Sequence, residues 1–252
     1  MTRMRSACVF VGLMICLVMR VMAEAPPEGF EAVFNGKDLS GFKPRERQKI
    51  DDLQKQWVYK KDGVIEFNPT GKRGEMTLWT EKEFADFTLA FDWKWVGPAQ
   101  KIQRPHLDPA TGDEKKDENG KVINEEVLEY DSGIYLRGSP KSQVNLWNWP
   151  AGSGEVYGYR TDRSQPQEVR AGVTPKKKMD KPLGEWNHME ITMKGDRLTV
   201  QLNGEEVISN AQLPGVPARG PIALQHHGAK KGGVWTSPPA LVQFRNIAIK
   251  EL

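Results

Sequence analysis

The sequence has no cysteine beyond its first sixteen residues, because its two cysteines are Cys8 and Cys16. Residues 17–252 therefore cannot form a disulfide, a zinc–cysteine site or a thiolate nucleophile. A domain without these supports depends on its hydrophobic core for stability. With 252 residues, 38% of them hydrophobic, the chain is long enough to bury such a core.

A surplus of basic charge is also missing once the N-terminus is set aside. The formal net charge is +3, but Arg3, Arg5 and Arg20 lie in the first 23 residues, which contain no acidic residue. Without these three arginines, 33 of the 36 basic residues remain, against 33 acidic ones. Nucleic-acid-binding proteins normally keep a positive surplus, so we expect no nucleic-acid partner.

No apolar run is long enough to span a bilayer. The apolar stretch at residues 7–18 follows a basic start and is too short, and Arg20 lies just beyond it. Small residues at 21–25 offer cleavage positions. This arrangement predicts a signal peptide over residues 1–25, a secreted or periplasmic location, and no stable membrane span after cleavage.

Several catalytic motifs are absent as well. The chain has no His-Glu-x-x-His, no phosphate-binding glycine loop and no Gly-x-Ser-x-Gly elbow. It also lacks the Glu-x-Asp-x-x-Glu strand with which laminarinase-type sandwich enzymes place two carboxylates across a glycosidic bond. An ordinary glycosidase of that kind is therefore excluded.

Short segments with alternating polarity fill most of the chain. Residues 87–96 place Leu89, Phe91, Trp93 and Trp95 on one face. Asn203-Gly204 between two alternating runs is typical of a type I′ hairpin. We also expect strands at residues 63–67, 134–137, 143–147, 154–159, 186–193, 222–225 and 241–249. The best helix candidate is the polar stretch at residues 43–55.

Many strands with almost no helix predict an all-β fold, an antiparallel β-sandwich or jelly roll. No repeat or linker divides the chain, so we expect a single domain over residues 26–252. Residues 97–126 stand apart, because they are charged and show little alternation. We expect a long surface loop there, either a mobile rim or lid over the site or a disordered insertion.

Strand parity gathers polar and aromatic side chains on faces away from the core. This set comprises Asp131, Tyr135, Arg137, Gln143, Asn145, Trp147, Glu155, Tyr157, Gln225 and His227. His226 would point to the opposite side from its neighbour, so the two histidines cannot easily bind one ion. Aromatic rings beside amides and charged groups suit a sugar, whose apolar face stacks on a ring. The alternative is an ordinary solvated face.

A series of motifs, in order, resembles the bacterial 3-keto-disaccharide hydrolase domain family. They are FNGKDLSGF (34–42), LWT (78–80), FADFTL (84–89), DSGIYLR (131–137), GEVYG (154–158), GEWN (184–187), LNG (202–204), GPIALQHHG (220–228) and FRNI (244–247). The resemblance covers about residues 30–252. It implies a concanavalin A-like jelly roll, action on sugars oxidised at carbon 3, and export.

The resemblance implies an exported enzyme that cleaves 3-keto-glycosides, and it guides the roles expected of individual residues. A ketone at carbon 3 acidifies the hydrogen on carbon 2, so cleavage needs one base and one positive group near the carbon 3 oxygen. We expect His227 as base or metal ligand, with Glu155 as the alternative base. Arg137 would stabilise the enolate, and Asp131 would orient Arg137 or bind a divalent metal ion.

The remaining side chains of the polar face would contact the carbohydrate substrate: Tyr135, Gln143, Asn145, Trp147, Tyr157 and Gln225. Trp147 and Tyr157 would supply stacking rings. Two other functions stay open at this point. A carbohydrate-binding module would need only aromatic rings and amides, and a structural sandwich would need no clustered open-face aromatics.

Overall fold

The computed structural model describes residues 25–44, 49–60, 62–68, 77–225, 227–231, 234–237 and 241–252. Residues 1–24 of the predicted signal peptide lie outside the described residues, and so does His226. Across the described ranges, no helix is both long and apolar enough to cross a membrane.

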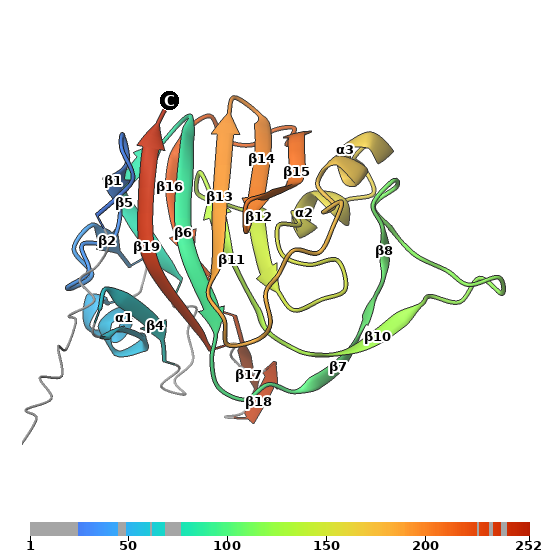
Figure 1. Ribbon diagram of the computed structural model, residues 1–252, viewed down its shortest axis with the longest axis horizontal. Helices are drawn as coiled ribbons and strands as arrows, with labels where there is room; N and C mark the ends of the chain where they lie inside the picture. Colours follow the sequence, from blue (N-terminus) through green and yellow to red (C-terminus); the bar gives the residue numbers. More distant parts are fainter. Residues whose placement is uncertain are drawn as a thin grey trace, which may run out of the picture.

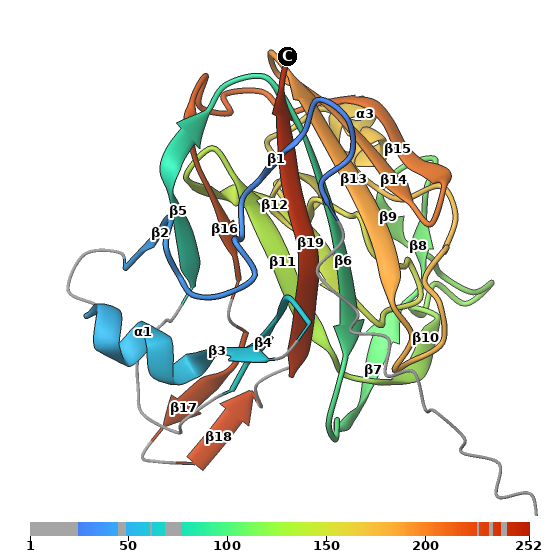
Figure 2. The same ribbon diagram turned by 60° about the vertical axis from the view of Figure 1, so that its left-hand side comes forward.

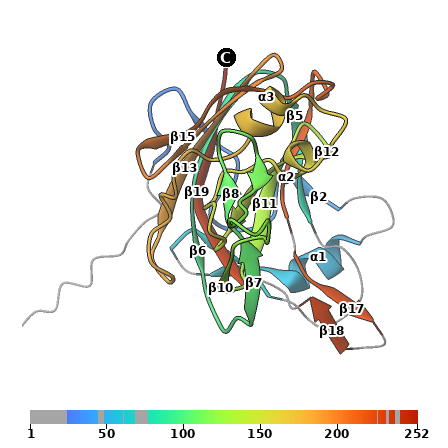
Figure 3. The ribbon, with the colours of Figure 1, turned by 90° about the vertical axis from the view of Figure 1, so that its right-hand side faces the viewer.

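Two antiparallel sheets pack face to face (Figures 1 and 3). The eight-stranded sheet has the order β15-β14-β13-β6-β19-β4-β3, and β1 pairs with β19. Its strands are β1 (Glu31–Ala32), β3 (Trp57–Lys60), β4 (Val64–Phe67), β6 (Phe87–Trp95), β13 (Asn187–Lys194), β14 (Arg197–Leu202), β15 (Glu205–Gln212) and β19 (Val242–Glu251).

The five-stranded sheet has the order β12-β11-β16-β5-β2. Its strands are β2 (Phe42–Lys43), β5 (Leu78–Phe84), β11 (Asp131–Leu136), β12 (Ser139–Trp147) and β16 (Gly220–Leu224). The helices are short: α1 (Ile50–Gln56), α2 (Tyr157–Arg160) and α3 (Gln167–Gly172). Figure 2 shows α1 and the β17–β18 hairpin (Ala229–Lys231, Val234–Ser237) at one end of the molecule. The predicted all-β antiparallel sandwich of the jelly-roll class is confirmed.

The core lies between the sheets and follows strand alternation. Leu89, Phe91, Trp93 and Trp95 of β6 are all buried, as their period of two predicts. They pack in one cluster with inward residues of the other sheet, such as Ile134 on β11. Burial of this apolar surface supplies the main stabilising free energy in a chain without disulfides.

The hairpin between β14 and β15 forms as predicted. Asn203 has φ 53° and Gly204 has φ 85°, and a type I′ turn needs positive φ at both positions. Asn203 also ties the turn to the sheet, because its Oδ1 accepts a hydrogen bond from the His188 backbone N–H at 2.9 Å.

The predicted strand at residues 154–159 is wrong. Gly154 donates its N–H to the Asn145 carbonyl, and Asn145 donates its own to the Glu155 carbonyl, so the chain follows β12 for only two residues. It then turns into α2, where Tyr159 donates its N–H to the Val156 carbonyl. This segment is too short for its alternating pattern to distinguish a strand from a helical turn.

The predicted loop at residues 97–126 also differs from the structure, because much of it is paired. β7 (Lys101–Pro105) pairs with β10 (Asn124–Leu128), and β8 (Leu107–Asp108) pairs with β9 (Asp113–Glu114). We call residues 101–128 the arm. It sweeps below the sandwich and rises beside α2 and α3 (Figure 1).

The tip of the arm, residues 109–113, is fastened to α3 and to the segments before and after it. The Asp113 carboxylate accepts hydrogen bonds from Arg163 and from Arg170, the latter at 2.6 Å. Lys176 donates to the Pro109 carbonyl at 2.7 Å. Gly112 packs so closely that an added Cβ would lie 2.7 Å from the Arg170 carbonyl oxygen.

Candidate active site

A pocket of about 420 Å³ opens on the face of the five-stranded sheet that points away from the core. Predicted and unpredicted residues line it together. They are Arg104, Glu129, Asp131, Pro140, Gln143, Asn145, Trp147, Trp149, Tyr157, Gly158, Gln225 and His227. Its volume lies in the range of small-molecule sites.

The register of β11 against β12 explains why the predicted residues meet here. Asp131 lies opposite Trp147, and Gly133 lies opposite Asn145. Side chains at alternate positions share a face, so Asp131, Asn145 and Trp147 all reach the same side of the sheet. The parity prediction for these residues agrees with their place in the pocket.

Gly133 makes room for a pair of amides. A Cβ at this position would lie 2.3 Å from Nε2 of Gln143, so only glycine lets that side chain cross β11. Gln143 Nε2 donates to the side-chain oxygen of Gln225, and Gln225 donates its backbone N–H to the Gly133 carbonyl at 2.8 Å. The two amides form a fixed polar edge of the pocket.

Asp131 and His227 form a half-buried acid–base pair. His227 Nδ1 lies 3.3 Å from Asp131 Oδ2, and their side chains are 26% and 13% exposed. Burial, together with the neighbouring Glu129 carboxylate, raises the pKa of Asp131 to about 7, although Arg104 opposes this. Burial also lowers the pKa of His227, which favours a neutral imidazole at pH 7.

The predictions missed two charged residues of the pocket, Arg104 and Glu129. Arg104 lies on β7 and forms an ion pair with Glu129, which follows β10. Both side chains are mostly buried, at 25% and 16% exposure. The arm therefore borders the site, which agrees with the rim position that was one of the two alternatives for residues 97–126. No motif in that charged stretch distinguished Arg104 from its neighbours.

Three aromatic rings form one wall of the pocket. Trp147 and Trp149 stack with centroids 3.8 Å apart and planes within 8°. Tyr157 meets both edge-on, at 6.2 Å and 6.4 Å. Tyr157 is 45% exposed, whereas Trp147 is 1% exposed and donates its indole N–H to the Gly152 carbonyl at 2.7 Å.

Trp147 therefore does not offer the sugar the exposed stacking ring that was expected of it. Its outer face is covered by Trp149, two residues further on, which lies beyond the end of β12. Alternation assigned Trp147 to the correct side of the sheet. It carries no information about residues beyond the strand, such as Trp149, which cover that side chain.

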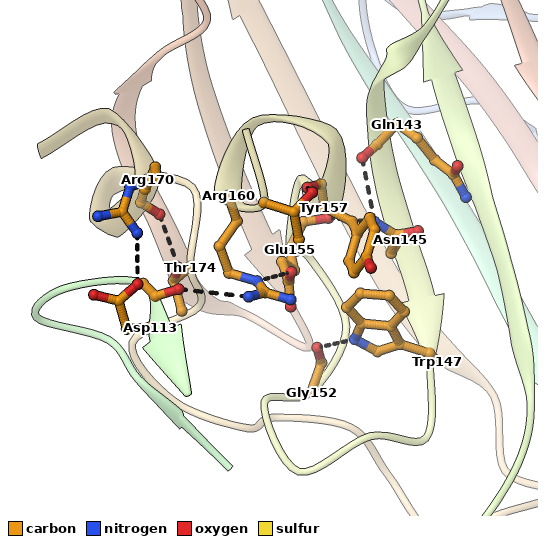
Figure 4. A network of polar contacts seen from close by, with 12 residues as sticks. Asp113, Gln143, Asn145, Trp147, Gly152, Glu155, Tyr157, Arg160, Arg170 and Thr174 are labelled. Atoms are coloured by element: carbon orange, nitrogen blue, oxygen red, sulfur yellow. Dashed lines mark hydrogen bonds and ion pairs between the residues drawn. The ribbon is translucent and has the colours of Figure 1, made fainter. Parts of the chain in front are cut away.

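Glu155 lies behind the pocket rather than in it. It is fully buried, forms an ion pair with Arg160, and is absent from the pocket lining (Figure 4). Burial raises its pKa to about 7, against the opposing effect of Arg160. Parity misplaced it because residues 154–159 are not a strand.

Arg137 does not belong to the site. β11 ends at Leu136, and Arg137 has a positive φ of 49°, so alternation no longer applies to it. Its guanidinium donates to the Ala85 and Gly195 carbonyls, at 2.7 Å and 2.6 Å, and pairs with Asp86. The predicted enolate-stabilising role of Arg137, and its orientation by Asp131, are thus wrong.

Tyr135 is on the predicted face but is not part of the pocket lining. It is 5% exposed and packs against Trp79 on β5, with centroids 5.6 Å apart. Trp79, Tyr135 and Ala223 form a small buried cluster on this side of the sheet. Tyr135 stabilises the sheet beside the site instead of touching what the pocket holds.

Unsatisfied polar atoms concentrate at the pocket. Within the described residues, five buried side-chain atoms have no hydrogen-bond partner: Trp93 Nε1, Arg104 Nε, Asp131 Oδ1, Trp149 Nε1 and Glu155 Oε2. Three of them belong to the pocket lining, two as donors and one as a carboxyl oxygen. Buried polar groups are normally paired, so this set is suited to a ligand that brings both acceptors and hydroxyl groups.

A metal ion was the alternative source of positive charge. Among the residues described, no three His, Cys, Asp or Glu side chains are grouped so as to hold one. Asp131 and His227 alone do not amount to such a group.

Comparison with solved structures gives the same fold. Three structures of provisionally assigned glycosyl hydrolases from Parabacteroides distasonis ATCC 8503 are similar to this chain, with TM-scores of 0.54, 0.52 and 0.51 and identities of 20%, 22% and 20%. The alignments cover 89%, 89% and 88% of this chain and 94%, 84% and 99% of theirs. At such low identity the likeness supports the fold alone.

A search of curated proteins found no match. The family comparison is more specific. The model of the 3-keto-alpha-glucoside-1,2-lyase-like domain matches residues 29–250, which include both sheets, the arm and every residue of the pocket. The chain therefore belongs to the family of 3-keto-alpha-glucoside-1,2-lyase-like domains.

Proposed function

We propose that this protein is an exported enzyme that cleaves the glycosidic bond of 3-keto-glycosides by elimination followed by hydration. The observation that carries the proposal is the half-buried Asp131–His227 pair in a pocket where three buried side-chain atoms have no hydrogen-bond partner among the described residues. Membership of the lyase-like family supports the substrate class. The absence of the paired-carboxylate strand motif is consistent with a reaction that does not require it.

The reaction begins with loss of the proton on carbon 2, which the neighbouring ketone acidifies. The electrons of that bond form an enolate whose negative charge lies on the carbon 3 oxygen. The enolate then restores the ketone and expels the oxygen on carbon 1, leaving a carbon 1–carbon 2 double bond. Water adds at carbon 1 while carbon 2 regains a proton. One water is consumed in the net cleavage, with no change in oxidation state.

His227 acts as the base in this scheme. Its pKa is lowered by burial, so the imidazole is neutral and able to accept a proton near pH 7. Asp131 faces Nδ1, so the proton from carbon 2 goes to Nε2. The protonated His227, held beside Asp131, then returns the proton to the departing oxygen, because a group that takes a proton as base can give it back as acid.

The rest of the pocket orients the sugar. The amides of Gln143, Gln225 and Asn145 offer donors and acceptors for its hydroxyls, and Tyr157 offers an exposed ring. A binding module without catalysis would use the same contacts. It has no need of a buried histidine beside a carboxyl group, which costs stability and is typical of reactive sites.

The test is to incubate the protein with methyl 3-keto-α-D-glucopyranoside in heavy water. We expect methanol release and deuterium at carbon 2 of recovered substrate or product. His227→Gln should lower both rates at least 100-fold, since general base catalysis contributes about 10²–10⁴-fold. No deuterium incorporation, with near-normal turnover in His227→Gln, would rule out elimination.

A matched control lies in the other sheet. His188 Nδ1 lies 2.8 Å from Asp92 Oδ1, which is a second His–Asp pair outside the pocket. His188→Gln should keep wild-type rates. Tight binding of the 3-keto-glycoside without cleavage by the wild type would instead identify a binding module.

Export is the second part of the proposal, supported by the apolar N-terminal stretch and its cleavage positions. Expression of the full chain in a bacterial host, followed by fractionation and N-terminal sequencing, tests it. We expect a secreted or periplasmic product that begins at residues 24–26. A cytoplasmic product that retains Met1 would contradict this.

A further inference from the structure

We infer that Arg104 is a catalytic residue that stabilises the enolate formed at the carbon 3 oxygen, in the role that the sequence had suggested for Arg137. The inference rests on the proposed function and adds to it the group that carries the positive charge. Arg104 lies on β7 of the arm, outside the five-stranded sheet to which Asp131, Gln143, Asn145 and Trp147 belong.

Arg104 is the arginine that lines the pocket. It lies with Glu129, Asp131 and His227, and its charge acts on both members of the acid–base pair. Arg160 forms an ion pair with Glu155 behind the pocket, and Arg137 donates hydrogen bonds to backbone carbonyls outside the pocket. Of Arg104, Arg137 and Arg160, only Arg104 lines the pocket and can contact a substrate held by His227.

The guanidinium is held in place by two contacts. Its central carbon lies 4.2 Å from the centroid of the Trp149 ring. Trp147 covers the other face of that ring at a centroid distance of 3.8 Å, so Arg104 completes a three-layer stack. Glu129 pairs with Nη2, which leaves the fork oriented rather than free to rotate.

One N–H donor of the Arg104 guanidinium has no hydrogen-bond acceptor among the described residues. Arg104 Nε is buried and lacks a hydrogen-bond partner among the described residues, as does Trp149 Nε1 in the same stack. An orphaned donor on a permanently charged group costs stability unless a ligand completes it. The carbon 3 oxygen supplies the missing acceptor, and the match is strongest when that oxygen becomes negative.

Arg104 assists the removal of the proton from carbon 2 and the departure of the oxygen from carbon 1. His227 takes the proton from carbon 2, and the two electrons of the broken C–H bond form a carbon 2–carbon 3 double bond. The π electrons of the ketone move to the carbon 3 oxygen, and the N–H groups of Arg104 bind the resulting enolate. When the carbon 1–oxygen bond breaks, the charge passes to the departing oxygen, which takes a proton from the Asp131–His227 pair. Arg104 itself gains and loses no proton in this step, since its guanidinium only donates hydrogen bonds.

The geometry also limits how the sugar can sit. Both faces of Trp149 are covered, so a sugar cannot stack on it while Arg104 is in place. Tyr157, with its ring 45% exposed, is left as the stacking surface of the wall. The sugar ring is thus placed between Tyr157 and the Asp131–His227 pair, with one edge toward Arg104.

The test compares Arg104→Gln with the wild type on methyl 3-keto-α-D-glucopyranoside. We expect kcat for methanol release to fall about 10²–10³-fold, as when one oxyanion-stabilising donor is removed, with a smaller change in KM. Deuterium exchange at carbon 2 should fall in parallel, because enolate formation itself is impaired. Guanidinium added to Arg104→Ala should restore part of the exchange, which a purely structural role would not allow.

The matched control is Arg245→Gln. Arg245 also stacks on a tryptophan, with its central carbon 4.1 Å from the Trp186 centroid, and also pairs with a carboxylate, Asp92, at 3.0 Å. It lies on the other sheet, so its loss should leave kcat unchanged. If Arg104→Gln fails to fold, Arg104→Lys keeps the charge but not the fork, and we expect at least a tenfold loss of exchange.

The outcomes separate the two proposals. Wild-type kcat and exchange in Arg104→Gln, or in Arg104→Lys where only that variant folds, would overturn the role of Arg104 alone. Failure of the wild type to exchange or cleave the 3-keto-glycoside would instead reject the proposed function. Loss of binding in Arg104→Gln with unchanged kcat would make Arg104 a substrate-binding residue and overturn the catalytic role.

Discussion

Trp147 and Tyr157 are neighbours in the aromatic wall but differ in exposure. We therefore expect substitution of Trp147 to affect mainly stability, and substitution of Tyr157 to affect mainly substrate binding. Trp147 is 1% exposed, so its replacement by Ala leaves a cavity. We expect Trp147→Ala to lose about 3–5 kcal/mol of unfolding free energy, measured by urea denaturation.

Tyr157→Ala provides the comparison within the same aromatic wall. Because this ring is 45% exposed, we expect less than about 1 kcal/mol of lost stability. Its loss should instead raise KM for the 3-keto-glycoside several-fold, since a stacked ring contributes about 0.5–1.5 kcal/mol beyond buried area. Equal losses of unfolding free energy in the two variants would contradict a buried Trp147 beside an exposed Tyr157.

Glu155 links protonation to stability. Its folded-state pKa is raised by burial from 4.5 to about 7, so between these values the folded state holds a proton that the unfolded state releases. The stabilising effect of that proton is complete below pH 4.5 and is lost as the pH rises through 7. We expect urea midpoints measured from pH 5 to 8 to decline less steeply in Glu155→Gln than in the wild type.

The control for this slope is Glu118→Gln, in an exposed turn of the arm away from its docked tip. It should keep the wild-type pH dependence. An unchanged slope in Glu155→Gln would mean that Glu155 is ionised in the folded protein at pH 5, with Arg160 outweighing its burial.

Sequence parity was dependable for residues inside paired strands and undependable beyond them. Tyr157, Gln225 and His227 line the pocket although they lie outside strands, whereas Arg137 and Glu155 do not line it. Asp131, Gln143, Asn145 and Trp147 are on paired strands, where a period of two holds. Arg137 and Glu155 each lie just past a strand end or in a turn, where a single change of φ redirects the side chain. Arg104 gave no signal, because β7 has no fully buried residue, and the residues of its partly buried side, Ile102 and Arg104, form no apolar alternation.

At the scale of elements, the arm is a two-stranded ribbon whose tip must dock for Arg104 to be in place. Gly112 lets the tip approach α3, since an added Cβ would meet the Arg170 carbonyl oxygen at 2.7 Å. We expect Gly112→Ala to lower kcat about 10–100-fold by shifting the arm, because misplacement of a catalytic group by about 1 Å costs on this order. The measurement is steady-state cleavage of the 3-keto-glycoside.

Gly120 is the matched control in the same arm. It has φ +79°, close to +73° at Gly112, so alanine is equally strained at both positions. A Cβ at Gly120 meets nothing within 4 Å. Gly120→Ala should therefore cost about 1 kcal/mol of local strain and leave kcat unchanged. If both variants behave alike, docking of the tip does not position Arg104.

The same arm shows why the sequence did not predict its strands. Helices and half-buried strands can be predicted from hydrophobic periodicity, which arises only where one face of the element is buried. β7 and β10 hold together through backbone pairing and ion pairs such as Lys101 with Glu126, at 2.7 Å. Such a ribbon resembles a polar loop in sequence, whereas β6, with its buried alternate residues, was predicted along its full length.

At the scale of the whole molecule, one core joins both sheets, and no covalent link supports it. Cys8 and Cys16 lie in the predicted signal peptide, so residues 26–252 have no thiol. Buried residues from the two sheets belong to a single cluster, which couples the loss of one sheet to the loss of the other. We expect residues 26–252 to unfold in urea in one transition, with the same midpoint with and without dithiothreitol.

Tryptophans report on both layers in that experiment, because Trp57 and Trp93 lie in the large sheet and Trp147 in the small one. Fluorescence and far-ultraviolet circular dichroism should therefore give coincident curves. Two separated transitions would mean that the sheets, or the arm, unfold independently and that Arg104 can leave the pocket while the sandwich stays intact. A midpoint that falls in dithiothreitol would contradict a fold held by its core alone.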